Sequence, residues 1–183
     1  GGHIGFQNSG SEPRLLQSLT MAKLYDLHAH STASDGTLTP AQLMQSAHAA
    51  GVQVMALTDH DTLDGLPEAS QTAADLGLGF VPGVEISVSW QQGTVHIVGL
   101  GISPDNDSLC EGLAGLRKFR GWRAEEIGRR LDKAGIPGAF EGARALSNGK
   151  LISRTHFARY LVDRGHAPDM RGVFRRYLVN GKP

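Results

Sequence analysis

Short apolar runs alternate with helical patterns from residue 23 to about residue 103, and this alternation limits the folds that the chain can adopt. Apolar runs of about four to eight residues between turn signals are typical of buried strands. Strand–helix–strand–helix spacing favours a parallel sheet with helices outside, either open or closed as a barrel. We therefore predict an α/β fold. The expected strands are residues 24–27, 52–58, 80–88 and 95–102.

Two helices are expected between the first three strands. Thr39 is a good N-cap and Pro40 is preorganised for a first helical turn, so a helix should begin there and end at Gly51. The second should run from near Pro67 to Leu76.

After residue 103 the pattern becomes helical. A turn cluster at 104–107 precedes three expected helices, at 109–134, 153–164 and 170–179. The first has a polar side rich in Arg and Lys, which we interpret as a solvated face. We divide the chain into three parts: residues 1–20, a tag or disordered leader; residues 21–105, the first part of the α/β domain; and residues 106–183, a helical insertion.

The composition excludes some classes of function. Lys plus Arg and Asp plus Glu are equal at 18 each, so no overall basic field points to a nucleic-acid coat, and any such substrate must be recognised locally. The lone Cys110 cannot form an internal disulfide, which fits a reducing cytoplasm. No run has the apolar length of a membrane span. We expect a cytoplasmic chain without a membrane or a stable protein partner.

Histidines and carboxylates follow or lie in all four expected strands. His28 and His30 are two apart in an extended segment, so both imidazoles can face one metal ion. Binding sites in α/β folds gather at the carboxyl ends of strands, so side chains from separate strands can converge there. A single histidine such as His96 is more often a core residue, and it is the joint occurrence that indicates a metal site. The expected ligands are His28, His30, Asp35, His60, Glu85 and His96.

The order of these motifs is specific. Asp-Leu-His-Ala-His-Ser, Ser-Asp-Gly, Leu-Thr-Asp-His-Asp, Pro-Gly-Val-Glu-Ile-Ser and Val-His-Ile-Val-Gly-Leu-Gly follow one another over residues 24–102. This series resembles the polymerase and histidinol phosphatase (PHP) family of metal-dependent phosphoesterases. Residues 152–159 resemble the inserted subdomain of one branch, which comprises nucleotide 3′,5′-bisphosphate phosphatases and 5′→3′ exoribonucleases.

The resemblance implies a fold and a cofactor. The fold would be the N-terminal portion of a distorted (β/α)7 barrel with an inserted helical subdomain. The cofactor would be two or three divalent ions, Mn²⁺ first and Fe²⁺ or Zn²⁺ as alternatives. The family also supplies ligands late in the chain, from a His-Pro-Gly-like motif and an Asp-x-His. Nothing after His96 matches either motif, so we expect the chain to be incomplete at its C-terminal side.

The resemblance also implies residue roles. His28 and His30 would bind one metal ion, and Glu85 would bridge two. The catalytic residues would be Asp35, His60 and Glu85. Arg154 and His156 are the candidates for contacts with the substrate phosphate. Asp59 is ambiguous and could orient a ligand.

We therefore expect a phosphoesterase that hydrolyses phosphate esters of nucleotides, such as 3′,5′-bisphosphonucleotides, or the 5′ ends of short RNA through a metal-activated water. Two alternatives stay open. One is a phosphatase for a small metabolite such as histidinol phosphate. The other is a non-catalytic accessory domain that binds metal.

Overall fold

The computed structural model describes residues 23–91 and 93–178. The leader expected at residues 1–20 and the end of the helix expected at 170–179 lie outside the described residues. The described part forms one four-stranded sheet with helices, and the strands lie side by side in chain order. They are β1 (Tyr25–Asp26), β2 (Val54–Leu57), β3 (Gly79–Trp90) and β4 (Gly93–Leu100).

The sheet is mixed, which corrects the expectation of a wholly parallel one. β1, β2 and β3 pair in parallel, but β3 and β4 pair antiparallel. Trp90 pairs directly with Gly93, so the two strands form a hairpin. A parallel arrangement would need a crossover of about a dozen residues or more.

Strand β3 has two halves with different partners. Its first half, from Gly79 to Pro82, pairs with β2, and its second half, from Gly83 to Trp90, pairs with β4. Past the end of β2 the chain leaves the sheet and touches β3 once more, through an isolated bridge between His60 and Glu85. This opening at the carboxyl end of β2 is where the expected ligands gather.

Helices α1 (Pro40–Ala49) and α2 (Leu66–Leu76) pack against β2 and β3 around a small apolar core that includes Met44, Met55 and Leu57. Thr39 caps α1 as predicted, because its side chain accepts the backbone N–H of Gln42. Gly77 ends α2 in a left-handed conformation, as the sequence also indicates.

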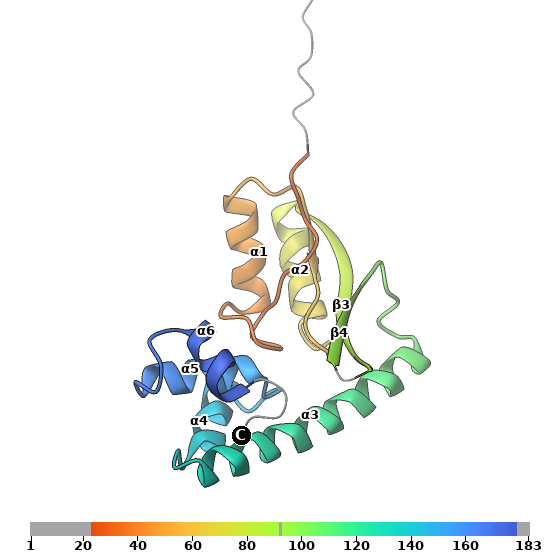
Figure 1. Cartoon of the computed structure of the whole chain (residues 1–183). Helices are drawn as coiled ribbons and strands as arrows, with labels where there is room; N and C mark the ends of the chain where they lie inside the picture. Colours follow the sequence, from red (N-terminus) through yellow and green to blue (C-terminus); the bar gives the residue numbers. More distant parts are fainter. Residues whose placement is uncertain (1–22, 92, 179–183) are drawn as a thin grey trace, which may run out of the picture.

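The second part of the chain is helical and has its own buried core, centred on Phe157 and Leu161. Its elements are α3 (Asp107–Lys133), α4 (Ala139–Leu146), α5 (Arg154–Asp163), α6 (Met170–Val173) and a π-helical turn (Phe174–Leu178). Figure 1 shows the long α3 running below the sheet, with α4, α5 and α6 gathered near the end of α3 that lies away from the β3–β4 hairpin.

Helix α4 was not predicted. Its sequence is short and contains Gly142, which reads as a helix breaker. The structure explains the glycine by packing, because a Cβ at position 142 would lie about 2 Å from the Tyr160 ring of α5. The close approach of α4 and α5 therefore requires a residue without a side chain.

Among the described residues, no helix combines the length and the apolar character that crossing a bilayer would need.

Candidate metal centre

Glu85 lies at the centre of the cluster. Its Oε2 is 2.7 Å from Nε2 of His28 and 2.9 Å from Nε2 of His30, and its Oε1 is 3.1 Å from Nδ1 of His96. Nδ1 of His60 is 3.8 Å from Oε2. The carboxylate side chain is only 8% exposed. One buried carboxylate therefore faces four imidazoles that come from three separate segments of the chain.

Backbone pairing holds His60 beside Glu85. The N–H of Glu85 donates to the carbonyl of Asp59, and the N–H of Asp61 donates to the carbonyl of Glu85. These two bonds extend the parallel register past the end of β2. The imidazole of His60 and the carboxylate of Glu85 are thus placed as side chains of adjacent segments.

The segment after β1 positions His28 and His30. Between them, Ala29 donates its N–H to the hydroxyl of Thr58 and accepts the Thr58 N–H at its carbonyl. The alternate residues therefore project away from these bonds and toward Glu85. Their Nε2 atoms lie 3.1 Å apart.

His96 reaches the cluster from the hairpin. It lies opposite Ser87 on β4, on the same face of the sheet as Glu85. The imidazoles form a continuous row, with ring centroids 5.1 Å apart from His28 to His30, 4.6 Å from His30 to His60 and 4.8 Å from His60 to His96. Strand β4 thus contributes His96 to the cluster, although it pairs antiparallel to β3 and not in parallel as the sequence predicts.

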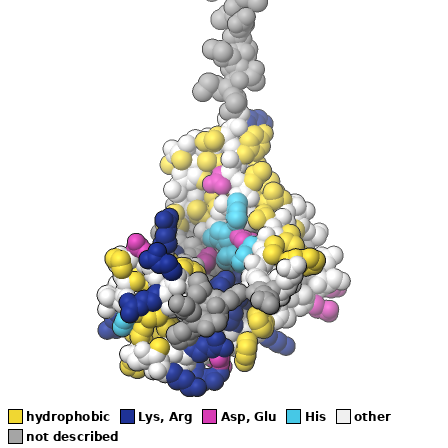
Figure 2. Space-filling view, in the orientation of Figure 1, with side chains coloured by type: hydrophobic (Ala, Val, Ile, Leu, Met, Phe, Trp, Pro, Cys, Tyr) yellow, Lys and Arg dark blue, Asp and Glu magenta, His cyan; other side chains and the backbone are white. Residues whose placement is uncertain are grey.

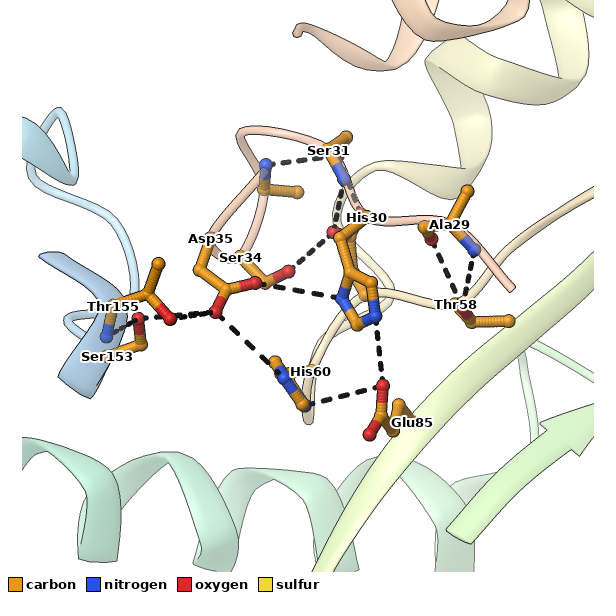
Figure 3. A network of polar contacts seen from close by, with 12 residues as sticks. Ala29, His30, Ser31, Ser34, Asp35, Thr58, His60, Glu85, Ser153 and Thr155 are labelled. Carbon is orange, nitrogen blue, oxygen red and sulfur yellow. Dashed lines mark hydrogen bonds and ion pairs between the residues drawn. The ribbon is translucent and has the colours of Figure 1, made fainter. Parts of the chain in front are cut away.

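Asp35 is the second carboxylate of the site and faces the helical part of the chain (Figure 3). Its carboxylate lies 3.7 Å from Nδ1 of His30 and 4.0 Å from Nε2 of His60. The hydroxyl of Thr155, in the first turn of α5, donates to Oδ2 at 2.9 Å, and Arg159 donates to the backbone carbonyl of Asp35. Asp35 therefore joins the cluster to helix α5.

The six predicted residues form three overlapping groups in which ligand atoms lie within 4.8 Å of one another. The groups are His28, His30 and Glu85; His30, Asp35 and His60; and His60, Glu85 and His96. Figure 2 shows the histidines gathered with acidic side chains in one place on this face of the molecule. The shared members would allow neighbouring ions to have ligands in common.

The protonation of the cluster fits divalent cations. Burial lowers the pKa of His60 to about 4, so its imidazole is neutral at neutral pH, as metal ligation requires. Burial alone would raise the pKa of Glu85, but the His28 hydrogen bond and the neighbouring imidazoles hold it below its ordinary value. Nδ1 of His30 and Nδ1 of His60 are buried without a hydrogen-bond partner. Two such nitrogens in a ring of donors fit a cation, because buried polar atoms otherwise find partners.

Asp59 holds the loop that carries Asp35. One carboxylate oxygen accepts the Ser31 N–H at 2.7 Å and the Ser34 hydroxyl at 2.6 Å, and the other accepts the Ser31 hydroxyl at 2.6 Å. Burial raises the pKa of Asp59, although these hydrogen bonds oppose the shift. The described contacts of Asp59 thus fix the loop after His30.

A buried ion pair beside the cluster was missed in the sequence analysis. The carboxylate of Asp61 accepts from the side chain of Arg120 and from the backbone N–H of Ser87, and Arg120 also donates to the Ser87 hydroxyl at 2.6 Å. Arg117 donates to the Asp61 carbonyl at 3.1 Å. The interpretation of the basic side of this helix as a solvated face is therefore wrong for Arg120, which is 4% exposed.

The spacing could have indicated this contact. Arg117, Arg120 and Arg123 are three residues apart, so they share one side of α3, and that side faces the sheet. The exposed basic residues of the helix, such as Lys118 and Arg129, lie elsewhere on its surface.

The two predicted substrate residues lie at the start of α5. Arg154 is half-buried, and burial together with the charge of Arg120 lowers its pKa. His156 is buried, and its Nδ1 accepts the Ser153 N–H at 3.0 Å in a capping box. Burial also lowers the pKa of His156, although the nearby Asp35 opposes that shift. One nitrogen of His156 is thus already used to start the helix.

The fold and the histidine–carboxylate cluster together define a PHP-type α/β protein, and the model of the PHP domain family matches residues 26–178. The chain belongs to this family. It is 54% identical over 159 residues to the 3′,5′-nucleoside bisphosphate phosphatase of Chromobacterium violaceum, covering 86% of this chain and 56% of that protein. It is 47% identical over 163 residues to the 5′-3′ exoribonuclease Rnm of Escherichia coli, covering 88% and 56%.

Solved structures show the same likeness. An amidohydrolase from Chromobacterium violaceum with bound sulfate and no metal aligns with a TM-score of 0.84 at 52% identity, over 87% of this chain and 56% of that one. A Bifidobacterium adolescentis protein assigned as a metal-dependent phosphoesterase aligns with a TM-score of 0.81 at 28% identity, over 88% and 57%. The chain thus spans a little over half the length of these relatives.

Proposed function

We propose that the protein to which this chain belongs is a divalent-metal-dependent phosphoesterase acting on nucleotides, such as 3′,5′-bisphosphonucleotides, or on the 5′ ends of short RNA. The observation that carries the proposal is the set of three overlapping ligand groups around Glu85 and His60. The relatives named a bisphosphate phosphatase and an exoribonuclease favour this substrate class over a small metabolite. The lone Cys110 is the reason to propose the cytoplasm as its location.

Six side chains would hold the ions: His28, His30, Asp35, His60, Glu85 and His96. Imidazole mixed with carboxylate suits Mn²⁺, Fe²⁺ or Zn²⁺ better than Mg²⁺ or Ca²⁺, and we propose Mn²⁺, with two or three ions per site. Glu85 offers one oxygen toward His28 and His30 and the other toward His96, so it would be shared between two ions. Further strands in the rest of the protein would close the sheet into the distorted (β/α)7 barrel.

Bound divalent ions would supply hydroxide near neutral pH and neutralise charge on the phosphate. The residues of this chain would prepare the site for that chemistry. Asp35 and Glu85 keep a low pKa and are anionic, and His60 is neutral. Glu85 is only 8% exposed, and the electrostatic contacts of a buried carboxylate are stronger than those of one in water.

Two arginines next to the cluster would bind the phosphate. Arg154 adjoins Ser153 and Thr155, which both contact Asp35. Burial and the charges of Arg120 and Arg154 lower the pKa of Arg123 to about 10, which leaves it a cation. Among the described residues neither Arg123 nor Arg154 has an ion-pair partner. Asp61 opposes the shift at Arg123 but is itself paired with Arg120. Three guanidinium groups close to one carboxylate favour an anionic ligand, and a guanidinium can bind phosphate through two hydrogen bonds.

Metal removal tests the proposal. The full-length protein treated with chelator should lose hydrolysis of adenosine 3′,5′-bisphosphate and of 5′-phosphorylated RNA, and added Mn²⁺ should restore it. Histidinol phosphate serves as the comparison substrate. Preferred turnover of histidinol phosphate would support the small-metabolite alternative. Tight Mn²⁺ binding without turnover of any of these esters would support the accessory-domain alternative.

Arg154→Ala should lower kcat/KM for the nucleotide substrate by roughly 10- to 100-fold, because a hydrogen bond to a charged group is worth about 1.5–3 kcal/mol. Metal content should not change, and Arg154→Lys should restore part of the activity. Steady-state kinetics and elemental analysis measure both. Arg171→Ala, an exposed change on α6, is the matched control. Equal activities of the Arg154 and Arg171 variants would remove Arg154 from the substrate site.

A further inference from the structure

A cavity of about 330 Å³ lies beside the metal centre, between strands β3 and β4 and helix α3. We propose that this cavity is a nucleobase subsite, in which the base of the substrate stacks on Phe119 while its phosphate lies at the cluster. The inference rests on the proposed function and deepens it. The lining residues are Asp61, Ser87, Val88, Ser89, Thr94, Leu116, Phe119, Arg120 and Arg123.

The strands make the cavity continuous with the metal centre. Ser87 and Ser89 follow Glu85 at two-residue steps, so the three share one face of β3. Across the hairpin, Thr94 and His96 pair with Ser89 and Ser87. Two residues of strand advance by about 7 Å. The cavity therefore begins about 7 Å along the strands from Glu85 and His96. This distance is similar to the width of the sugar that separates a base from its phosphate.

The floor of the cavity offers an aromatic surface. The Phe119 side chain is 49% exposed although it lies on the side of α3 that meets the hairpin. The Trp122 ring braces it, with centroids 5.6 Å apart and planes at 33°, and the Arg123 guanidinium lies 5.9 Å from its centroid. Aromatic rings and arginine planes that remain open to solvent are the surfaces on which bases stack.

The polar lining of the cavity suits a nucleotide, which has a neutral base and an anionic phosphate. Arg120 is already engaged by the Asp61 carboxylate and the Ser87 hydroxyl. Arg123 is the other cation of the lining, and the proposed function assigns it to the phosphate. The hydroxyls of Ser89 and Thr94 can donate to or accept from the edge of a base. Apolar contact comes from Leu116 and Phe119. A mostly apolar pocket of this size with a few polar groups matches the usual pattern of small-molecule sites.

The test compares ligands with and without a base in the full-length protein with Mn²⁺. Phe119→Ala should weaken binding of adenosine 5′-monophosphate, and raise the KM for adenosine 3′,5′-bisphosphate, by roughly 5- to 150-fold, the range that loss of one base–aromatic stack gives. Binding and turnover of ribose 5-phosphate should stay within about twofold of wild type. Phe119→Trp should retain nucleotide affinity. Equilibrium binding followed by tryptophan fluorescence supplies a readout that does not need turnover.

Two further variants provide an independent test of the subsite and a control. Ser89→Phe fills the cavity from β3 without touching the helix and should show the same selective loss as Phe119→Ala. Trp90→Ala removes a 67% exposed aromatic that does not line the cavity, and should leave both ligands unaffected. Loss of both ligands to the same extent in Phe119→Ala, or unchanged nucleotide affinity in it and in Ser89→Phe, would overturn the subsite. If wild type hydrolyses neither adenosine 3′,5′-bisphosphate nor 5′-phosphorylated RNA, the phosphoesterase proposal fails, and the binding comparison still decides the subsite.

Discussion

Glu85→Ala is expected to remove the metal ions from the cluster and to lower phosphoester hydrolysis by at least roughly 100- to 1,000-fold, the loss seen when one preorganised electrostatic group is deleted from an active site. The carboxylate is the member that reaches His28, His30 and His96 at hydrogen-bond distance. Without it, two of the three ligand groups lose their anion. Elemental analysis of bound Mn²⁺ and the initial rate of bisphosphonucleotide hydrolysis measure the two effects.

Glu85→Gln separates charge from shape in the same experiment. The amide keeps the volume and one oxygen, so the fold should persist, but the negative charge shared by the imidazoles disappears. We expect a metal content between those of wild type and the alanine variant, with activity near the alanine level. Glu111→Ala, at an exposed position of α3, should match wild type. A fully metal-loaded and active Glu85→Ala protein would refute the central place of this carboxylate.

The sequence predicts that these side chains converge, and the convergence has a physical reason. His28, His30, His60 and Glu85 come from the carboxyl-end side of parallel strands, where chain direction alone brings side chains together. Asp35 is placed in the set by its position in the loop after His30 and by the Ser-Asp-Gly motif of the family resemblance. The structure shows what holds that loop, since Asp59 accepts hydrogen bonds from Ser31 and Ser34.

Sequence periodicity could not give the direction of β4. An apolar run looks alike in a parallel and in an antiparallel strand, and only the short connection from Trp90 to Gly93 distinguishes them. Helix α4 was missed for a different reason, because Gly142 opposes helix by propensity and is explained only by its packing on Tyr160. Pairing direction and tight packing are both tertiary properties.

The arginines of α3 also show what sequence patterns cannot predict. A basic side of a helix is usually solvated, and composition gave no reason to separate Arg120 from Lys118. Arg120 differs from Lys118 because it pairs with the carboxylate of Asp61, which is fully buried and lies 59 residues away along the chain. The Thr-Asp-His-Asp motif contained this partner, but a motif does not say which of its carboxylates pairs with an arginine.

Asp61→Asn is expected to destabilise the fold by about 3–5 kcal/mol, because it leaves the buried Arg120 guanidinium without its counter-charge. Asparagine keeps the acceptor for the Ser87 N–H and tolerates the left-handed conformation of this position, whose φ is 51°. The lost stability can therefore be assigned to the charge. Urea unfolding of wild type and variant, followed by circular dichroism, measures it through the shift in midpoint.

The double variant Asp61→Asn with Arg120→Met tests the assignment. Replacing both ends of a buried ion pair by uncharged groups removes the unpaired charge, so the double variant should recover much of the stability that Asp61→Asn loses. Arg129→Ala, a change at an exposed position of the same helix, should shift the midpoint little. If the single and double variants are equally unstable, the pair does not hold α3 to the sheet by its charges, and other contacts of the helix, such as the hydrogen bond from Arg117 to the Asp61 carbonyl, must account for the docking.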